Sequence, residues 1–118
     1  MDTELLITGG RVVAETAVLP RGYVLVRGGR IVSVGAGDPP AAGAGGPGLG
    51  AATIDATGLT VLPGLIDMHT HGIGDADFME ADVEGMLQAL RRYAQFGLTG
   101  VVGSTLSNPF ANIIEQAR

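Results

Sequence analysis

Residues 63–72 read PGLIDMHTHG, and they contain both histidines of this 118-residue chain, His69 and His71. In a β-strand, residues two apart point to the same side, so Leu65, Asp67, His69 and His71 would share one face. At about 3.3 Å per residue, two imidazoles so placed lie close enough to bind one metal ion. We therefore predict that His69 and His71 are metal ligands. Asp67 is a candidate either to orient an imidazole as a hydrogen-bond acceptor or to make a structural hydrogen bond, and it is not assigned to the metal.

An isolated His-x-His pair is a weak motif, because it can equally be a solvated turn. Its surroundings favour the metal site. The strand is entered from Pro63-Gly64 and is left at Gly72, shortly before a predicted helix. That order places the imidazoles at the carboxyl end of a parallel strand, where barrels and open α/β enzymes carry their chemistry.

The residues after the histidines predict alternating strands and helices. A strand over Leu65–His71 is followed by an amphipathic helix that begins at Asp82 as N-cap and stops at Gly97. A second strand covers Leu98–Thr105, and Ser-Asn-Pro at 107–109 opens a second helix, with the proline at the first helical position. This order predicts parallel strands. The apolar positions of the first helix recur three and four residues apart: Val83, Met86, Leu87, Leu90 and Ala94.

The residues before the histidines predict short strands joined by glycine turns, the sequence form of β-hairpins. A stretch built almost entirely from Ala, Gly and Pro, residues 36–52, interrupts them and predicts a loop with too little apolar surface to order itself. The change of pattern places a domain boundary between residues 62 and 63. The strands are predicted near residues 5–8, 11–14, 23–26 and 31–34, with a last hairpin formed by 53–55 and 59–62.

Composition excludes several classes of function. The chain has a formal net charge of −5 and no basic cluster, which argues against nucleic acid as a partner. It has no cysteine, so any metal must be held by nitrogen and oxygen ligands. An acidic start and the lack of an apolar run of about 20 residues predict a cytoplasmic protein that does not span a membrane.

Three segments together resemble the metal-dependent amidohydrolase superfamily. The run from Asp55 to His71, DATGLTVLPGLIDMHTH, is similar to the entry into that superfamily's barrel. The earlier LLITGGRVV and VLVRGGRIVSVG are similar to its N-terminal β-sandwich strands. The resemblance implies an α/β chain: a β-sandwich portion over 1–62, then the first βαβα part of a TIM-like (β/α)₈ barrel over 63–118, with the barrel incomplete.

Within the superfamily, HGIGDADFMEA and FGLTGVVGSTLSNP look most like the N-acetylglucosamine-6-phosphate deacetylases. This implies a divalent metal, zinc or iron, held by His69 and His71, an amino-sugar phosphate as substrate, and a homo-oligomer, a dimer. The remaining ligands and the proton shuttle would come from later strands, so no catalytic residue is assigned within these 118 residues. We expect these residues alone to be inactive.

Other possibilities stay open. The chain could belong to another amidohydrolase of deaminase, dihydroorotase or dipeptidase type, or act as a non-catalytic binding or oligomerisation module. Gly72, Gly74, Asp75 and Asp77 form the loop above the predicted site, where a turn role is as reasonable as substrate contact. Residues 104 and 105, Ser and Thr, close the second strand and are predicted to pack at the rim of the site.

Overall fold

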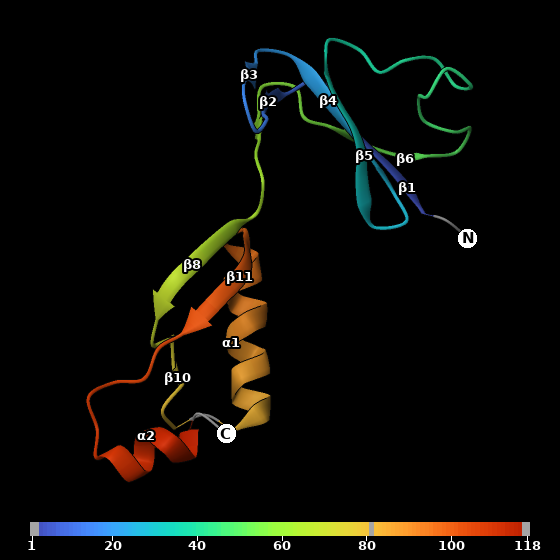
Figure 1. Cartoon of the computed structure of the whole chain (residues 1–118). Coiled ribbons are helices and arrows are strands. Elements are labelled where there is room, and N and C mark those ends of the chain that lie inside the picture. Colours follow the sequence, from blue (N-terminus) through green and yellow to red (C-terminus); the bar gives the residue numbers. More distant parts are fainter. Residues whose placement is uncertain (1–2, 81, 117–118) are drawn as a thin grey trace. The chain divides into compact units, whose positions relative to one another are not determined.

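The computed structural model describes residues 3–80 and 82–116. It is a mixed α/β structure in which strands predominate (Figure 1). The chain divides into two compact units, Met1–Pro63 and Gly64–Arg118, and each is described by itself below.

A four-stranded sheet with the order β5-β4-β1-β6 forms most of the first unit. β4 runs antiparallel to both β1 and β5, whereas β6 runs parallel to β1. Leu6, Tyr23 and Leu25 form a buried cluster on this sheet, and the Leu25 side chain is fully enclosed. The strands are β1 (Glu4–Thr8), β4 (Gly22–Arg27), β5 (Arg30–Ala36) and β6 (Ala52–Asp55).

A three-stranded sheet with the order β3-β2-β7 completes this unit; its strands are β2 (Arg11–Val13), β3 (Val18–Leu19) and β7 (Thr60–Val61). Two predicted hairpins are therefore wrong. β1 does not pair with β2, and β6 does not pair with β7, because each member belongs to a different sheet. The hairpin between β4 and β5, turning at Gly28-Gly29, is confirmed.

Hydrogen bonds at the glycine pair explain the error. Gly9 has a φ of +87°, which favours glycine, and its N–H donates to Gly22 O (3.1 Å). The chain thus leaves the first sheet instead of turning back on itself. The connection from β6 to β7 also passes from the first sheet to the second. Beside it, Ala56 N donates to Thr8 O (2.8 Å) and Arg11 N donates to the Leu59 carbonyl (3.0 Å).

The Ala/Gly/Pro-rich loop contains no helix or strand between Ala36 and Ala52. Both of those residues are already in strands, so the predicted loop over 36–52 is one residue too long at each end. Two charged side chains of the sheet contact it. Arg27 Nη2 donates to Gly46 O (2.6 Å), and Gly48 N donates to Glu4 Oε2 (2.6 Å). Arg27 and Glu4 also pair directly with each other, so the loop is attached where composition predicted an unanchored linker.

The second unit follows the predicted order of strand, helix, strand and helix. β8 (Leu65–Thr70) and β11 (Leu98–Gly103) are parallel neighbours, and α1 (Val83–Gln95) lies beside them (Figure 1), so the βαβ prediction is confirmed. A small hairpin of β9 (Gly72–Ile73) and β10 (Ala76–Asp77) occupies the predicted loop after the histidines.

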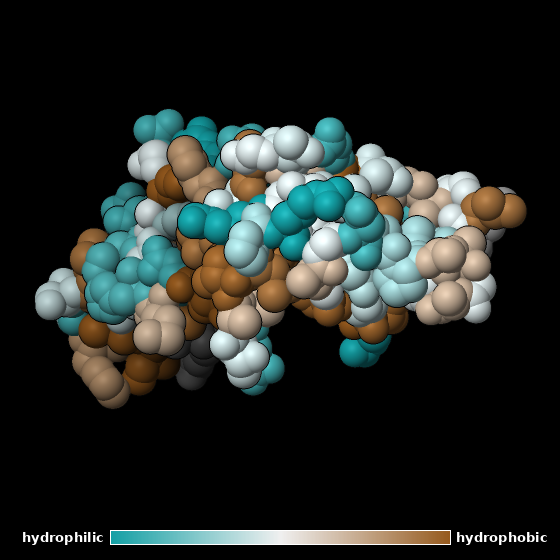
Figure 2. Space-filling model, turned by 90° about the horizontal axis from the view of Figure 1, so that it is seen from above, coloured by the Kyte–Doolittle hydropathy of each residue, from teal (hydrophilic) through white to brown (hydrophobic). Residues whose placement is uncertain are grey.

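The first helix begins and ends as predicted. Asp82 Oδ1 accepts a hydrogen bond from Gly85 N (2.8 Å), and Gly97 has a φ of +82° just after the helix. Ala89 and Tyr93 are its buried residues, whereas the predicted apolar face is largely exposed at Val83, Leu87, Leu90 and Ala94. Figure 2 shows hydrophobic residues, in brown, exposed on the face of the molecule that it presents. Two strands are too few to cover the whole apolar stripe.

The second helix, α2 (Phe110–Gln116), begins one residue after Pro109, whose carbonyl accepts from Ile113 N (3.2 Å). Pro109 therefore stands just before the helix, not at its first position as predicted. No helix among residues 3–80 and 82–116 is long and apolar enough to cross a membrane.

Candidate metal centre

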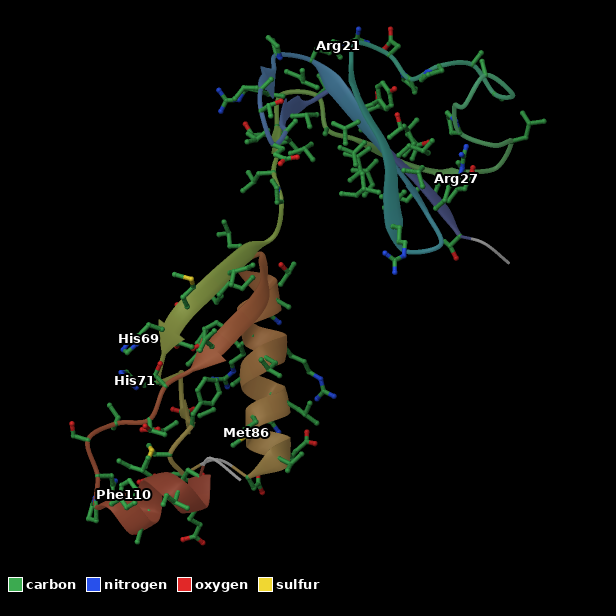
Figure 3. The ribbon with its side chains drawn as sticks, in the orientation of Figure 1. Arg21, Arg27, His69, His71, Met86 and Phe110 are labelled. Carbon is green, nitrogen blue, oxygen red and sulfur yellow. The ribbon has the colours of Figure 1, made fainter. Side chains whose placement is uncertain are left out.

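The two imidazoles lie side by side at the carboxyl end of β8 (Figure 3). His69 is the penultimate residue of β8, and His71 is the first residue after this strand. Their ring centroids are 4.9 Å apart, and the ring planes are nearly perpendicular at 87°. His69 is exposed and His71 is half-buried, so the pair is accessible to a small ligand.

Ser104 contacts both rings from the end of the neighbouring strand. Its backbone carbonyl lies 2.9 Å from Nδ1 of His71, and its hydroxyl lies 3.2 Å from Nδ1 of His69. A carbonyl oxygen only accepts hydrogen bonds, so Nδ1 of His71 must carry the hydrogen. The Nε2 atom of that ring then keeps its lone pair, as a metal ligand requires.

A buried hydrogen-bond network supports β8 from its other side. Thr70, between the two histidines, is buried, and its hydroxyl pairs with the hydroxyl of Tyr93 from α1. Tyr93 also donates to Gly72 O (2.6 Å). The strand end that carries the imidazoles is thus tied to the helix through one phenol group. This role of Tyr93 was not predicted, because a buried aromatic residue on a helix gives no sequence signal of it.

The carboxylates near the histidines make local contacts. Asp67 Oδ1 accepts from the backbone N–H of His69 (3.1 Å), which agrees with the structural hydrogen bond among its two predicted roles. In the described residues the imidazoles contact Ser104 and not Asp67. Asp75 and Asp77 lie on the β9–β10 hairpin beside His71, and Asp77 Oδ1 accepts from Met79 N (2.8 Å). A hollow of about 240 Å³ is lined here by His71, Gly72, Gly74, Asp75, Ala76 and Asp77.

Two nitrogen ligands are what the described residues offer to a metal. Within residues 3–80 and 82–116, no group of three or more His, Cys, Asp or Glu side chains is arranged to hold an ion. The pair itself fits a borderline divalent metal, because neutral imidazole is a ligand for zinc and iron and the His71 ring is already oriented by its hydrogen bond. A catalytic zinc usually takes three protein ligands, so the pair is part of a site rather than a whole one.

Known proteins resemble the chain in sequence. The model of the amidohydrolase family matches residues 52–108. An N-acetylglucosamine-6-phosphate deacetylase of Vibrio furnissii is 38% identical over 45% of this chain and 13% of its own length. A dihydroorotase of Leifsonia xyli subsp. xyli is 31% identical over 98% of this chain and 24% of its own length.

Solved structures resemble it as well. N-acetyl-D-glucosamine-6-phosphate deacetylase from Mycobacterium smegmatis, in a mutant form complexed with N-acetyl-D-glucosamine-6-phosphate, matches 97% of this chain and 28% of its own. The TM-score is 0.80 and the sequence identity is 28%.

These relatives, two deacetylases and a dihydroorotase, are thus similar to a chain of mixed α/β fold that carries a histidine pair at a strand end. The similarity to the amidohydrolase family extends over residues 52–108, which include both histidines. The chain spans between 13% and 28% of the length of the relatives named above.

Proposed function

We propose that His69 and His71 supply two metal ligands in a hydrolase of the N-acetylglucosamine-6-phosphate deacetylase type. In this proposal β8, α1, β11 and α2 are the first βαβα part of a (β/α)₈ barrel, preceded by a β-sandwich portion. The observation that carries it is the juxtaposition of the two imidazoles, 4.9 Å apart, at the carboxyl end of a strand that pairs in parallel with β11.

The chemistry that a bound divalent metal supplies in such a site is polarisation of a carbonyl group and activation of water near neutral pH. The residues of this chain orient the two imidazoles and leave them accessible to the metal. Ser104 orients the rings, and the pair of Tyr93 and Thr70 fixes the strand end beneath them. The reaction itself needs further groups, namely a third protein ligand and a proton shuttle, which we propose come from elements outside residues 1–118.

The likeness to the deacetylase structure supports the choice of substrate. It extends over 97% of the chain, and the sequence similarity to the Vibrio deacetylase points the same way. We therefore propose N-acetylglucosamine 6-phosphate as substrate, with glucosamine 6-phosphate and acetate as products. The water oxygen would enter the acetyl group, and the C–N bond would break to leave the amine.

The test is acetate release from N-acetylglucosamine 6-phosphate by the full-length protein that contains this sequence. We expect activity that is lost on treatment with a chelator and restored by zinc or iron. His69→Ala and His71→Ala should each lower kcat/KM by at least about 100-fold, in line with the loss of a metal ligand. Gln95→Ala, at the exposed end of α1, is the control and should keep wild-type activity. Full activity in both histidine variants would contradict the proposal.

A second candidate is a ring-opening hydrolase of the dihydroorotase type. It is favoured by the Leifsonia dihydroorotase, whose similarity extends over 98% of the chain. The same histidine pair would serve it. Assaying dihydroorotate hydrolysis beside acetate release separates the two, since turnover of dihydroorotate alone would replace the deacetylase assignment within the same family.

A further inference from the structure

Ser104 makes a hydrogen bond to each of three consecutive residues of the candidate metal centre. Its N–H donates to Thr70 O (2.7 Å), its carbonyl accepts from Nδ1 of His71, and its hydroxyl contacts Nδ1 of His69. The pairing of β8 with β11 makes this possible, because Gly103 is in register with Thr70 and Ser104 follows immediately. One residue therefore reaches both imidazoles and the peptide between them.

We infer that Ser104 is a positioning residue that holds both imidazoles with hydrogen on Nδ1 and leaves both Nε2 lone pairs directed at a divalent cation. The inference rests on the proposed metal site. For His71 the backbone carbonyl allows only this tautomer. For His69 the hydroxyl accepts the ring hydrogen and can donate its own hydrogen to water, since Ser104 is only half-buried.

The alternative is that Ser104 merely closes the strand. In that case its N–H and carbonyl would matter, but its hydroxyl would not. The two roles differ at one atom, because the hydroxyl contacts His69 while the backbone contacts Thr70 and His71. Replacing the side chain therefore separates positioning from strand closure.

The measurement is the tautomer of each imidazole, read from the ring-nitrogen resonances of the metal-free 118-residue chain at about pH 9, above the ordinary imidazole pKa of about 6.5. The chain contains two histidines, so the spectrum holds two rings only. Wild type should show hydrogen on Nδ1 in both. In Ser104→Ala, His69 should lose this preference, whereas His71, held by the backbone carbonyl, should keep it. Ser104→Thr, which retains a hydroxyl, should restore His69.

Zinc affinity gives a second readout. Ser104→Ala should bind Zn²⁺ about 10-fold more weakly than wild type, the lower end of the loss expected when a partner of a metal-bound imidazole is removed. Ser107→Ala, an exposed serine in the next loop, is the matched control and should leave affinity and tautomers unchanged.

Three results would overturn the inference: hydrogen on Nε2 of His69 in wild type, a Ser104→Ala variant with unchanged tautomer and affinity, or disturbance of both rings in the Ala and the Thr variants alike. None of these depends on a substrate. The inference can therefore fail while the deacetylase proposal stands, and the deacetylase assay can fail while the tautomers agree.

Discussion

The Tyr93 hydroxyl ties α1 to the strand end that carries the histidines. It donates to Gly72 O and pairs with the Thr70 hydroxyl in a buried setting. Tyr93→Phe should destabilise the second unit by about 1–3 kcal/mol, because the part-buried Gly72 carbonyl and the buried Thr70 hydroxyl each lose a hydrogen bond. Urea unfolding followed at the two histidine resonances measures this, since both histidines lie in that unit.

Tyr23 provides the matched control. It is as buried as Tyr93, both being 7% exposed, and its hydroxyl contacts Ser33 Oγ (3.1 Å) in the first unit. Tyr23→Phe should leave unfolding at the histidine resonances unchanged. Equal effects of the two substitutions on those resonances would show that the Tyr93 network has no specific role.

At the residue scale, sequence reasoning could find the imidazoles but not their partners. The two-residue period of a strand brings His69 and His71 to one side, so their proximity follows from local geometry. Ser104 is 33 residues beyond His71, and its contact depends on the register between β8 and β11. Register is set by the packing of the whole unit, so Ser104 was predicted only as a rim residue.

At the scale of elements, the start of α1 rests on one side chain. Asp82 Oδ1 accepts from Gly85 N, satisfying one of the free N–H groups of the first turn. Asp82→Ala should lower the stability of the second unit by about 1 kcal/mol, measured by urea unfolding. Asp82→Asn keeps a capping oxygen and should stay close to wild type. Equal losses in both variants would mean that charge rather than capping stabilises the helix.

Another prediction concerns the pH dependence of the first unit. The Arg27 guanidinium, and after it the Gly48 N–H, hold the pKa of Glu4 below its ordinary value of 4.5. The charged form is thus favoured in the folded state. Its contribution to the free energy of unfolding is complete above 4.5 and is lost as the pH falls through the lowered folded pKa.

Glu4→Gln should therefore weaken the first unit at neutral pH and flatten its loss of stability in acid. Unfolding followed at Tyr23 ring resonances, from about pH 6 down to about pH 3, measures both effects. Glu15→Gln, an exposed carboxylate after β2, is the control and should keep the wild-type profile. An acid profile unchanged by the Glu4 substitution would contradict the prediction.

Helices and strands were predicted better than the way strands pair. The cap at Asp82 and the stop at Gly97 are local signals, and α1 lies between them. Hairpins were predicted wherever a glycine pair separated two strands. That rule succeeds at Gly28-Gly29 and fails at Gly9-Gly10. At Gly9-Gly10 the chain passes into another sheet, and β1 pairs with β4 and β6 instead of β2. The residues of a turn do not indicate such long-range strand pairing.

At the scale of the whole molecule, large apolar side chains of the second unit lie open. Ile66 and Met68 of β8 are 69% and 78% exposed, and Phe110 of α2 is 77% exposed. Parallel strands are normally covered on both faces. This exposure supports the proposal that further barrel elements pack against β8 and α2. The proposal also agrees with the lengths of the named relatives, of which the chain spans 13% to 28%.

The most direct test of the central claim is a Zn²⁺ titration of the 118-residue chain, followed at the ring nitrogens of its two histidines. We predict that the Nε2 resonances of His69 and His71 shift together and saturate with one ion per chain, and that His69→Ala abolishes the shift of His71. Saturation at one ring alone, or a His71 shift that survives His69→Ala, would contradict a shared metal centre.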